Sequence, residues 1–402
     1  MKAFFTYAFS ILILLLTNQH VKAEEKVLVV GAGIVGASIA YHLAIEGVEV
    51  IVIDMQSPAS HASLGTFAWI NASWAKQPKA YHSLNQESVA YWHPLSKQLN
   101  IPVKWGGSLE WFANPKRQEK LSQQIQEQQR WGEAAKMVSP LNAKSLEPKV
   151  NFMDVDALAY SQNDGAVDPA QATNQFLSAA MNNGAKVKYP CKLESITDTK
   201  TTRVANTTCG PISFNKLVLA VGAASNTITD IAKMDIPQRT TPGIIVVTEP
   251  IEPLLNNIIV APGVHIHQRL DGRVVLGEQA GPPNTSAHSA RLQNRPNEYP
   301  NEALAQQHAN SILDNAIKYV PKLSNAQVEN VYIGWRPLPL DGHPVLGFST
   351  EVPYVYIAVT HSGVTLAPIL GLMVSQELIG NKSIDALSRY RPSRQFEKVK
   401  RY

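Results

Sequence analysis

Three glycines near the start of the chain have a spacing suited to binding phosphates. They follow the apolar run 26–30 and precede a helical pattern at 37–46, and a second apolar run, 48–53, ends in an acid. In such a turn, glycine permits a tight bend, a close approach of the backbone to a pyrophosphate, and contact between helix and strand. The helix start offers unpaired N–H groups to the phosphates, and the acid can accept hydrogen bonds from a ribose. This complete strand–turn–helix–strand unit predicts a dinucleotide site rather than a chance glycine-rich turn, with contacts from Gly31, Ala32, Gly33, Ile34, Val35, Gly36 and Asp54.

A second set of candidate residues lies near the end of the chain. Residues 331–337, VYIGWRP, read as a strand that delivers Arg336. A planar guanidinium can hold a carboxylate through two charge-assisted hydrogen bonds. The alternative is a structural ion pair between Arg336 and an acid such as Asp341. Residues 361–368, HSGVTLAP, form a loop of small residues before a final helix, whose N-terminus can face developing negative charge.

The elements that must position these residues follow from the hydrophobic pattern. We expect helices at 79–99, with a kink at Pro94, and at 115–131, 170–182 and 301–320. Expected strands are 103–112, 186–196, 201–209, 211–214, 216–222, 244–248, 258–260, 264–267, 273–276 and 354–359. The strands at 186–196, 201–209 and 211–214 should form a small antiparallel meander. The polar segment 281–300 reads as a connector, with a mobile lid as the functional alternative.

The order of motifs resembles the D-amino-acid oxidase family, which includes glycine oxidase, sarcosine oxidase and D-amino-acid dehydrogenases. The resemblance covers nearly all of the chain after residue 23. It implies an α/β fold with a discontinuous Rossmann-like FAD-binding domain and a substrate domain with an antiparallel sheet and flanking helices. The stretches that carry it are the glycine turn, DGAVDP (164–169), VLAVGA (218–223), GWRP (334–337) with Asp341 and Pro344, and Gly363 with Leu366-Ala367-Pro368.

The resemblance also implies a division of the chain and a set of site residues. Segments 24–76, 151–235 and 328–392 would form the FAD-binding domain, and 77–150 and 236–327 the substrate domain. Arg336 would grip the substrate carboxylate. His361 stands where the glycine oxidase branch carries a further basic residue, and we include it as a catalytic candidate. Further implied FAD contacts are Ser60, Ser63, Thr66, Gly222, Gly334, Ser362, Gly363, Val364 and Thr365, and no metal ligand is predicted.

The implied activity is oxidation of a carbon–nitrogen bond in a small amino acid or N-alkylamino acid. Hydride transfer to FAD would leave an imine that hydrolyses to an oxo acid, with oxygen, a quinone or a redox protein as the electron acceptor. Two alternatives stay open. A nicotinamide-dependent dehydrogenase would share the glycine turn, and a secreted flavin-binding module without turnover would share the cofactor motifs.

Residues 1–23 read as a cleaved signal peptide. Lys2 precedes thirteen mostly apolar residues, 4–16, and Ala23 ends a small-x-Ala cleavage site. The alternative, a membrane anchor, needs about 20 apolar residues. We therefore expect a periplasmic or secreted protein without a transmembrane segment after processing. Removal of Lys2 and Lys22 reduces 36 basic residues to 34, against 32 acidic ones, and this balance gives no patch for nucleic acid.

The cysteines, histidines and tryptophans leave alternatives open. Cys191 and Cys209 flank a predicted hairpin turn and are either a disulfide or two free thiols. His61 is either a flavin contact, covalent attachment included, or a solvated loop histidine. His265 and His267 share one side of a strand, which either lines the substrate pocket or faces solvent. Six of the seven tryptophans lie between residues 69 and 131, and we favour packing over an aromatic wall for them.

Overall fold

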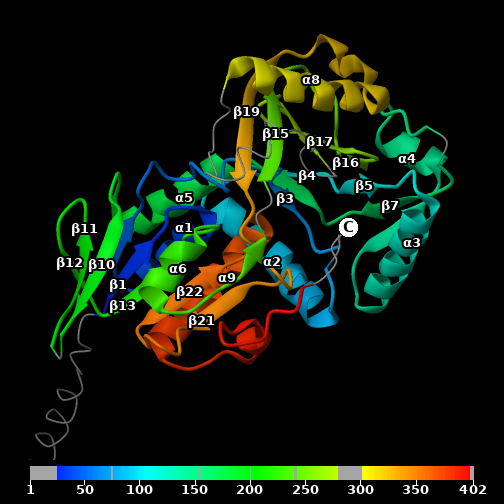
Figure 1. Ribbon diagram of the computed structural model, residues 1–402. Helices are drawn as coiled ribbons and strands as arrows, with labels where there is room; N and C mark the ends of the chain where they lie inside the picture. The colour runs from blue at the N-terminus through cyan, green and yellow to red at the C-terminus, as the bar shows by residue number, and fades with distance from the viewer. Residues whose placement is uncertain are drawn as a thin grey trace, which may run out of the picture.

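The computed structural model describes residues 25–73, 76–153, 155–199, 201–239, 242–278 and 301–398. Two large sheets dominate these residues, one mostly parallel and one mostly antiparallel, with helices packed against both (Figure 1). This arrangement is the predicted fold class. The expected signal peptide and the segment 281–300 lie outside the described residues.

The parallel sheet carries the glycine turn at its centre. β1 (Lys26–Val30) pairs in parallel with β2 (Glu49–Ile53) on one side and with β13 (Lys216–Leu219) on the other. The strand order is β21-β22-β13-β1-β2-β9, with β9 at Lys186–Lys188, β21 at Val345–Phe348 and β22 at Val355–Val359. Only β21 runs antiparallel, at an edge. The inner strands read as continuous apolar runs because both faces of a parallel sheet are covered.

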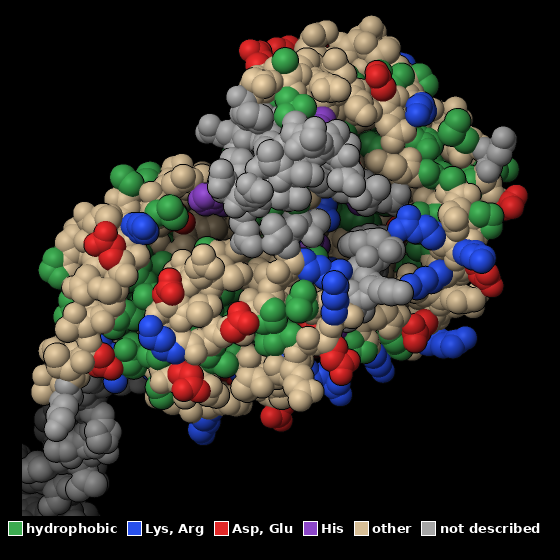
Figure 2. Space-filling view, viewed as in Figure 1, with side chains coloured by type: hydrophobic (Ala, Val, Ile, Leu, Met, Phe, Trp, Pro, Cys, Tyr) green, Lys and Arg blue, Asp and Glu red, His purple; other side chains and the backbone are tan. Residues whose placement is uncertain are grey.

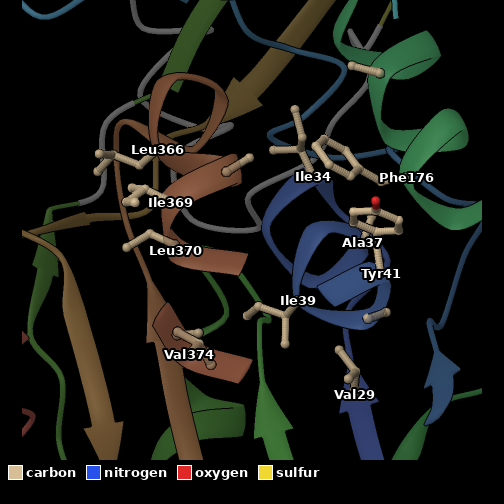
Figure 3. Close-up of a cluster of buried hydrophobic side chains, with 14 of the residues drawn as sticks. Val29, Ile34, Ala37, Ile39, Tyr41, Phe176, Leu366, Ile369, Leu370 and Val374 are labelled. Atoms are coloured by element: carbon tan, nitrogen blue, oxygen red, sulfur yellow. The ribbon is translucent and has the colours of Figure 1, made fainter. Parts of the chain in front are cut away.

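Four helices cover one face of this sheet. They are α1 (Ile34–Ile45), α2 (Lys79–Gln98), α5 (Pro169–Asn182) and α9 (Gly363–Gly380). Figure 3 shows Ile34 and Ile39 of α1 directed towards α9, with Leu370 and Val374 on the facing helix. A Cβ at Gly371 would lie 2.3 Å from Ser38 Oγ, so glycine there permits the close approach of the two helices. Among the described helices α9 alone is long and apolar enough to cross a bilayer, and 67% of that span is buried.

The other face of the parallel sheet packs against a meander and a short helix. The meander consists of β10 (Leu193–Asp198), β11 (Arg203–Thr207) and β12 (Ile212–Phe214), and the helix is α6 (Ser225–Ala232). Both β10–β11 and β11–β12 are antiparallel pairs, as predicted. The predicted strand 186–196 was wrong as a single element, because Lys186–Lys188 pairs with β2 in the parallel sheet instead.

The second large sheet has the order β19-β15-β18-β17-β16-β5-β7-β6. Its neighbours are antiparallel except β16 and β5. One face is covered by α8 (Glu302–Tyr319) and the 3-10 helix Pro321–Asn325, which share an apolar core with it. The strands are β5 (Ser108–Glu110), β6 (Ala135–Val138), β7 (Leu158–Ser161), β15 (Pro242–Thr248), β16 (Ile258–Ala261), β17 (Val264–Gln268), β18 (Val274–Glu278) and β19 (Val328–Trp335).

Short elements connect the two large sheets. β3 (Trp69–Ile70), β8 (Gly165–Val167) and β4 (Val103–Trp105) form a three-stranded sheet. The predicted strand 103–112 is therefore two strands, because Gly106 and Gly107 separate β4 from β5 and the two join different sheets. The remaining elements are α3 (Pro115–Arg130), α4 (Pro140–Leu146), β14 (Gln238–Arg239), β20 (Leu338–Pro339) and the 3-10 helix Asp385–Tyr390.

Packing refines the predicted division of the chain. β7 and β19 fall in segments that we assigned to the FAD-binding domain, yet both are strands of the eight-stranded sheet. The helix α2 falls in a segment assigned to the substrate domain, yet Trp92 and Leu95 on its buried face join the core of the parallel sheet. Trp92 Nε1 also donates to the carbonyl oxygen of Val364 at 3.0 Å. We therefore group these elements by the cores in which they pack.

Cys191 and Cys209 form a disulfide, which resolves the alternative left open by the sequence. The bond closes a loop with a sequence separation of 18 residues. It joins the meander to the parallel sheet, and the Cys191 N–H donates to the carbonyl oxygen of Asp54 at 2.6 Å. The disulfide therefore anchors the chain beside the acid at the end of β2.

Removing this disulfide should destabilise the protein. Closing a loop of this length lowers the entropy of the unfolded chain, which raises the free energy of unfolding by about 3 kcal/mol. We expect the double variant Cys191→Ser, Cys209→Ser to unfold at a correspondingly lower urea concentration, followed by circular dichroism. Reductant should lower the urea midpoint of the native protein and leave that of the variant unchanged. Equal midpoints for the native and variant proteins would contradict the assignment.

A candidate cofactor and substrate cavity

A cavity of about 490 Å³ lies at the carboxyl ends of β1, β13 and β22 and extends to the second sheet. This volume is in the range of ligand sites, and the carboxyl edge of a parallel sheet is where such sites form. Its walls come from the glycine turn, the loop 59–71, the chain after β13, strands β15, β17 and β18, and the segments 334–337 and 358–365. Figure 2 shows acidic and basic side chains mixed over the described surface of one face of the molecule.

The glycine turn packs directly against the end of β13. Gly31 has φ +109°, and a Cβ there would lie 2.3 Å from the carbonyl oxygen of Ala220. A Cβ at Gly36 would lie 2.0 Å from the Gly31 oxygen. Gly33 differs, because it lines the cavity, where a Cβ would approach only Ser63 Oγ, at 3.1 Å. Gly33 therefore leaves space on the cavity side of the turn, as a backbone that approaches a pyrophosphate must.

Hydrogen bonds fix the position of the glycine turn relative to Asp54 and to the following loop. The Ala32 N–H donates to Asp54 Oδ2 at 2.7 Å, and the Ile34 N–H donates to Ser63 Oγ at 3.0 Å. Ala32 is fully buried and Gly36 packs beneath the turn, so neither lines the cavity. Both residues support the turn from behind, and our prediction that they contact the cofactor stays a prediction.

The other predicted site residues converge on the same cavity from distant parts of the chain. Their individual roles stay predictions, but the fold places them around one space. Those lining the cavity are Gly31, Gly33, Ile34, Val35, Asp54, Ser60, Ser63, Thr66, Gly222, Gly334, Arg336, His361, Ser362, Gly363, Val364 and Thr365. Exposed His61 also lines it.

Gly65 and Gly334 allow two backbones to touch. A Cβ at Gly334 would lie 2.0 Å from the Gly65 oxygen, and one at Gly65 would lie 2.4 Å from the Gly334 Cα. The loop after β2 thus lies directly on the end of β19, two residues before Arg336. Sequence reasoning missed Gly65, whose only signal is a glycine within a loop of small residues.

Arg336 lies at the end of the cavity formed by the second sheet. A Cβ at Gly243 on β15 would lie 3.2 Å from Arg336 Nε and 3.3 Å from Nη2, so the missing side chain makes room for the guanidinium. His265 lines the same region, where burial and the positive Arg336 lower its pKa to about 3. His265 is therefore neutral at physiological pH and adds no charge beside the arginine.

The two histidines of β17 have separate roles. His267 Nε2 donates to the carbonyl oxygen of Phe67 at 2.9 Å, and burial lowers the pKa of His267 to about 3. Only His265 lines the cavity. The strand face that they share is covered by Phe67, whose ring centroid is 5.4 Å from that of His265. The sequence left open whether this side of the strand lines a pocket or faces solvent. His265 lines the cavity, and neither histidine lies on an exposed face.

A buried lysine stands at the start of α9. Lys76 Nζ donates to Ser362 Oγ at 2.8 Å, and Tyr81 Oη lies 2.9 Å from the same oxygen. Lys76 is only 5% exposed and lines the cavity. A cation and a helix N-terminus thus add positive potential at one place. Sequence reasoning missed Lys76, because a single lysine outside any motif carries no signal.

Asp164 supports the cavity wall from behind. Trp69 Nε1 and Ser108 Oγ donate to Asp164 Oδ2 at 2.9 and 2.6 Å, and Trp69 lines the cavity. Burial raises the pKa of Asp164 to about 8. The side chain is therefore mostly a neutral acid at pH 7, and the DG motif of the sequence has a structural use here.

Substituting Gly33 should block the phosphate side of the turn. We expect Gly33→Val to fold with native circular dichroism but to bind FAD at least ten-fold more weakly, because its side chain fills the place that a pyrophosphate needs. Fluorescence titration of apoprotein with FAD measures this loss. Gly380→Ala is the matched control, since nothing lies within 4 Å of a Cβ there. Equal affinity for Gly33→Val and the control would refute the assignment.

Asp164→Asn should change how stability depends on pH. Because the folded pKa of Asp164 lies above its unfolded value, the folded protein holds this proton more tightly and loses stability as pH rises from about 4 to about 8. An amide mimics the neutral acid, so the variant should lose less stability than the native protein over this range. Urea unfolding at pH 5 and pH 8.5 measures both slopes, and parallel slopes would contradict the raised pKa.

The chain resembles proteins of known function along most of its length. It is 23% identical over 377 residues to one of the opine oxidase subunits of Agrobacterium tumefaciens (strain Ach5), with 91% of this chain and 96% of that protein covered. It superimposes on glycine oxidase from Geobacillus kaustophilus with a TM-score of 0.82 at 21% identity, with 93% and 100% covered. L-proline dehydrogenase from P. horikoshii gives a TM-score of 0.80 at 24% identity, with 92% and 97% covered.

These likenesses extend across both sheets and confirm the fold that the motifs predicted. Residues 26–377, from the first strand to near the end of the last helix, match a single family. The protein with this glycine turn and two-sheet cavity belongs to the FAD dependent oxidoreductase family DAO.

Proposed function

We propose that this protein oxidises the carbon–nitrogen bond of a small amino acid or N-alkylamino acid. The observation that carries the proposal is Arg336, which lies in the cofactor cavity over the backbone of Gly243. Similar proteins named for opines, glycine and L-proline support this substrate class. When bound, FAD supplies the two-electron acceptor.

Arg336 orients the substrate. Its guanidinium fork matches a carboxylate with two charge-assisted hydrogen bonds, so the carbon next to that carboxylate is held in one place. The adjoining wall consists of Phe67, Trp69 and Ile245, which exclude water from the same end of the cavity. The substrate would lose a hydride from this carbon and leave as an imine, which hydrolyses to an oxo acid.

The start of α9 supplies positive potential on the opposite side of the cavity. The helix dipole and Lys76 act together there, and Ser362 links them through its hydroxyl. Such a region stabilises negative charge that develops on a bound group during reduction. We assign His361 to the same segment as a polar neighbour of the substrate.

Of the alternatives raised by the sequence, the nicotinamide-dependent dehydrogenase does not fit a family defined by FAD. A flavin-binding module without turnover differs from an enzyme only in substrate reduction. The substrate experiment below therefore separates the two.

We also propose that the protein is exported. The apolar run 4–16 with its cleavage site supports this, and so does the disulfide, because disulfides persist in oxidising compartments such as the periplasm. The electron acceptor would then be oxygen, a quinone or a redox protein.

The Arg336→Ala variant should still bind FAD, but the substrate should no longer reduce this FAD efficiently. A panel of glycine, sarcosine, proline and D-amino acids, mixed anaerobically with the yellow protein, identifies a substrate by flavin bleaching. With that substrate we expect the variant to lose on the order of 10²-fold in apparent affinity, the size of a buried charged hydrogen-bond pair. Repeating the native reaction in air distinguishes an oxidase from a dehydrogenase.

Arg273→Ala is the matched control. Arg273 directly precedes β18, forms an ion pair with Glu329 at 2.6 Å and does not line the cavity. It should leave bleaching unchanged. If the native protein is bleached by no amine in the panel, the module without turnover is favoured. If Arg336→Ala is bleached as readily as the control, the carboxylate role is wrong.

A further inference from the structure

The disulfide between Cys191 and Cys209 reaches the wall of the cofactor cavity. Cys191 and the next two residues, Lys192 and Leu193, line the cavity. The Cys191 N–H donates to the carbonyl oxygen of Asp54 at 2.6 Å, so this wall adjoins the acid at the end of β2. An acid in this place accepts hydrogen bonds from the ribose of a bound dinucleotide. The wall 191–193 would therefore meet the adenosine half of FAD.

The wall lies on a connection between two sheets. β9 belongs to the parallel sheet, whereas β10 belongs to the meander. The Lys192 N–H donates to Thr208 Oγ1 at 2.9 Å, and the Thr208 N–H donates to the Lys192 carbonyl oxygen at 3.0 Å. Next to these bonds, the pairing of β10 with β11 is irregular between Leu193 and Ser195. The disulfide to Cys209 adds a covalent link where the strand pairing is weakest.

Asp54 connects this wall to the glycine turn. Its carbonyl oxygen accepts from Cys191, and its Oδ2 accepts from the Ala32 N–H at 2.7 Å. A shift of the wall at Cys191 therefore reaches the backbone that faces the phosphates through two successive hydrogen bonds. The disulfide restrains both the wall and the acid beside it.

The two ends of the disulfide differ in exposure. Cys191 is 1% exposed and lines the cavity. Cys209 is exposed and does not line the cavity. Thiol–disulfide exchange begins when a thiolate attacks an accessible sulfur. The bond can therefore be attacked from solvent at Cys209, on the side away from the cofactor.

We propose that the Cys191–Cys209 disulfide controls how tightly the protein holds FAD, and that a dithiol reductant weakens this binding. One thiolate of the dithiol attacks Cys209 Sγ, the S–S bond breaks, and Cys191 Sγ leaves and takes up a proton. The second thiol then displaces Cys209, which also becomes a thiol. Two electrons and two protons pass to the cysteines, and the dithiol becomes a disulfide. Cofactor retention of this kind does not depend on which amine the protein oxidises.

The expected size of the effect follows from the fraction of protein with an ordered wall. A ligand that binds one conformation has an apparent dissociation constant equal to its intrinsic value divided by the fraction in that conformation. When the disulfide opens, the connection 189–192 keeps its hydrogen bonds but gains conformations. If the wall is then ordered in one molecule in ten, the dissociation constant of FAD rises about ten-fold.

The test is serial dilution of the FAD-loaded protein, in which the fluorescence of released FAD gives the dissociation constant. It compares the native protein before and after dithiothreitol, the double variant Cys191→Ser, Cys209→Ser, and the control Thr202→Ala. Thr202 Oγ1 lies 2.9 Å from Thr199 Oγ1, and neither residue lines the cavity. We expect reduction and the double variant to weaken FAD binding about ten-fold and the control to match the native protein. Reoxidation should restore the native affinity.

Two readouts separate this role from general stabilisation by the disulfide. All forms should show native circular dichroism under the conditions of the dilution, because a folded protein that is merely less stable keeps its affinity for FAD. With FAD in excess, the visible spectrum of the bound flavin should be the same in every form, because the wall meets the adenosine half. Dithiothreitol should leave the double variant unchanged, which controls for a direct effect of the reductant.

A reciprocal measurement needs no variant. If reduction weakens FAD binding ten-fold, bound FAD must make the disulfide ten-fold harder to reduce. Native protein is equilibrated with mixtures of reduced and oxidised dithiothreitol, with and without saturating FAD, and its thiols are counted by alkylation and mass spectrometry. We expect FAD to raise the ratio needed for half reduction about ten-fold.

Three results would each overturn the proposal. The first is an equal affinity for FAD before and after reduction of the native protein. The second is a ratio for half reduction that FAD does not change. The third is a bound-flavin spectrum that differs between the oxidised and reduced forms, because the disulfide would then act on the flavin end of the cavity.

Discussion

The contact between the Gly65 and Gly334 backbones is the constraint on which the site depends. No side chain fits at either position, and the contact joins the loop that follows β2 to the last strand of the second sheet. It joins the two sides of the cavity and sets Arg336, two residues later, at the end formed by the second sheet. A cofactor site and a substrate site can share one space because these backbones meet.

Burial, rather than the number of charged residues, sets which side chains carry a charge inside the cavity. The chain as a whole is close to neutral, and Figure 2 shows mixed charges on the described surface. Inside, Arg336 stays cationic, whereas His265 is neutral because burial and Arg336 both oppose its protonation. Burial raises the pKa of Glu278, the last residue of β18, to about 7. Removal from water shifts the pKa values of these residues, since the charged form of each loses the most solvation.

Features that depend on neighbours in sequence were predicted well. The glycine turn, the start of α5 and the start of α8 all appear as expected. Asp168 Oδ1 accepts hydrogen bonds from two N–H groups of α5 at 2.9 Å, and Asn301 Oδ1 accepts one from Leu304. Helix caps and turns depend on residues that are close in sequence, so they can be recognised without knowledge of the fold. The strand 103–112 failed because the sheets that its two halves join are chosen by distant partners.

The sequence by itself therefore determined the cofactor turn, the order of elements and the arginine of the GWRP motif. The tertiary structure decided that Ala32 and Gly36 lie behind the turn, and that Gly65 and Lys76 line the same cavity as the predicted site residues. The physical reason is that these residues act through burial and through contacts across long stretches of chain. Neither burial nor such contacts leave a periodic or spaced signal in the sequence, because they exist only after the two sheets have packed together.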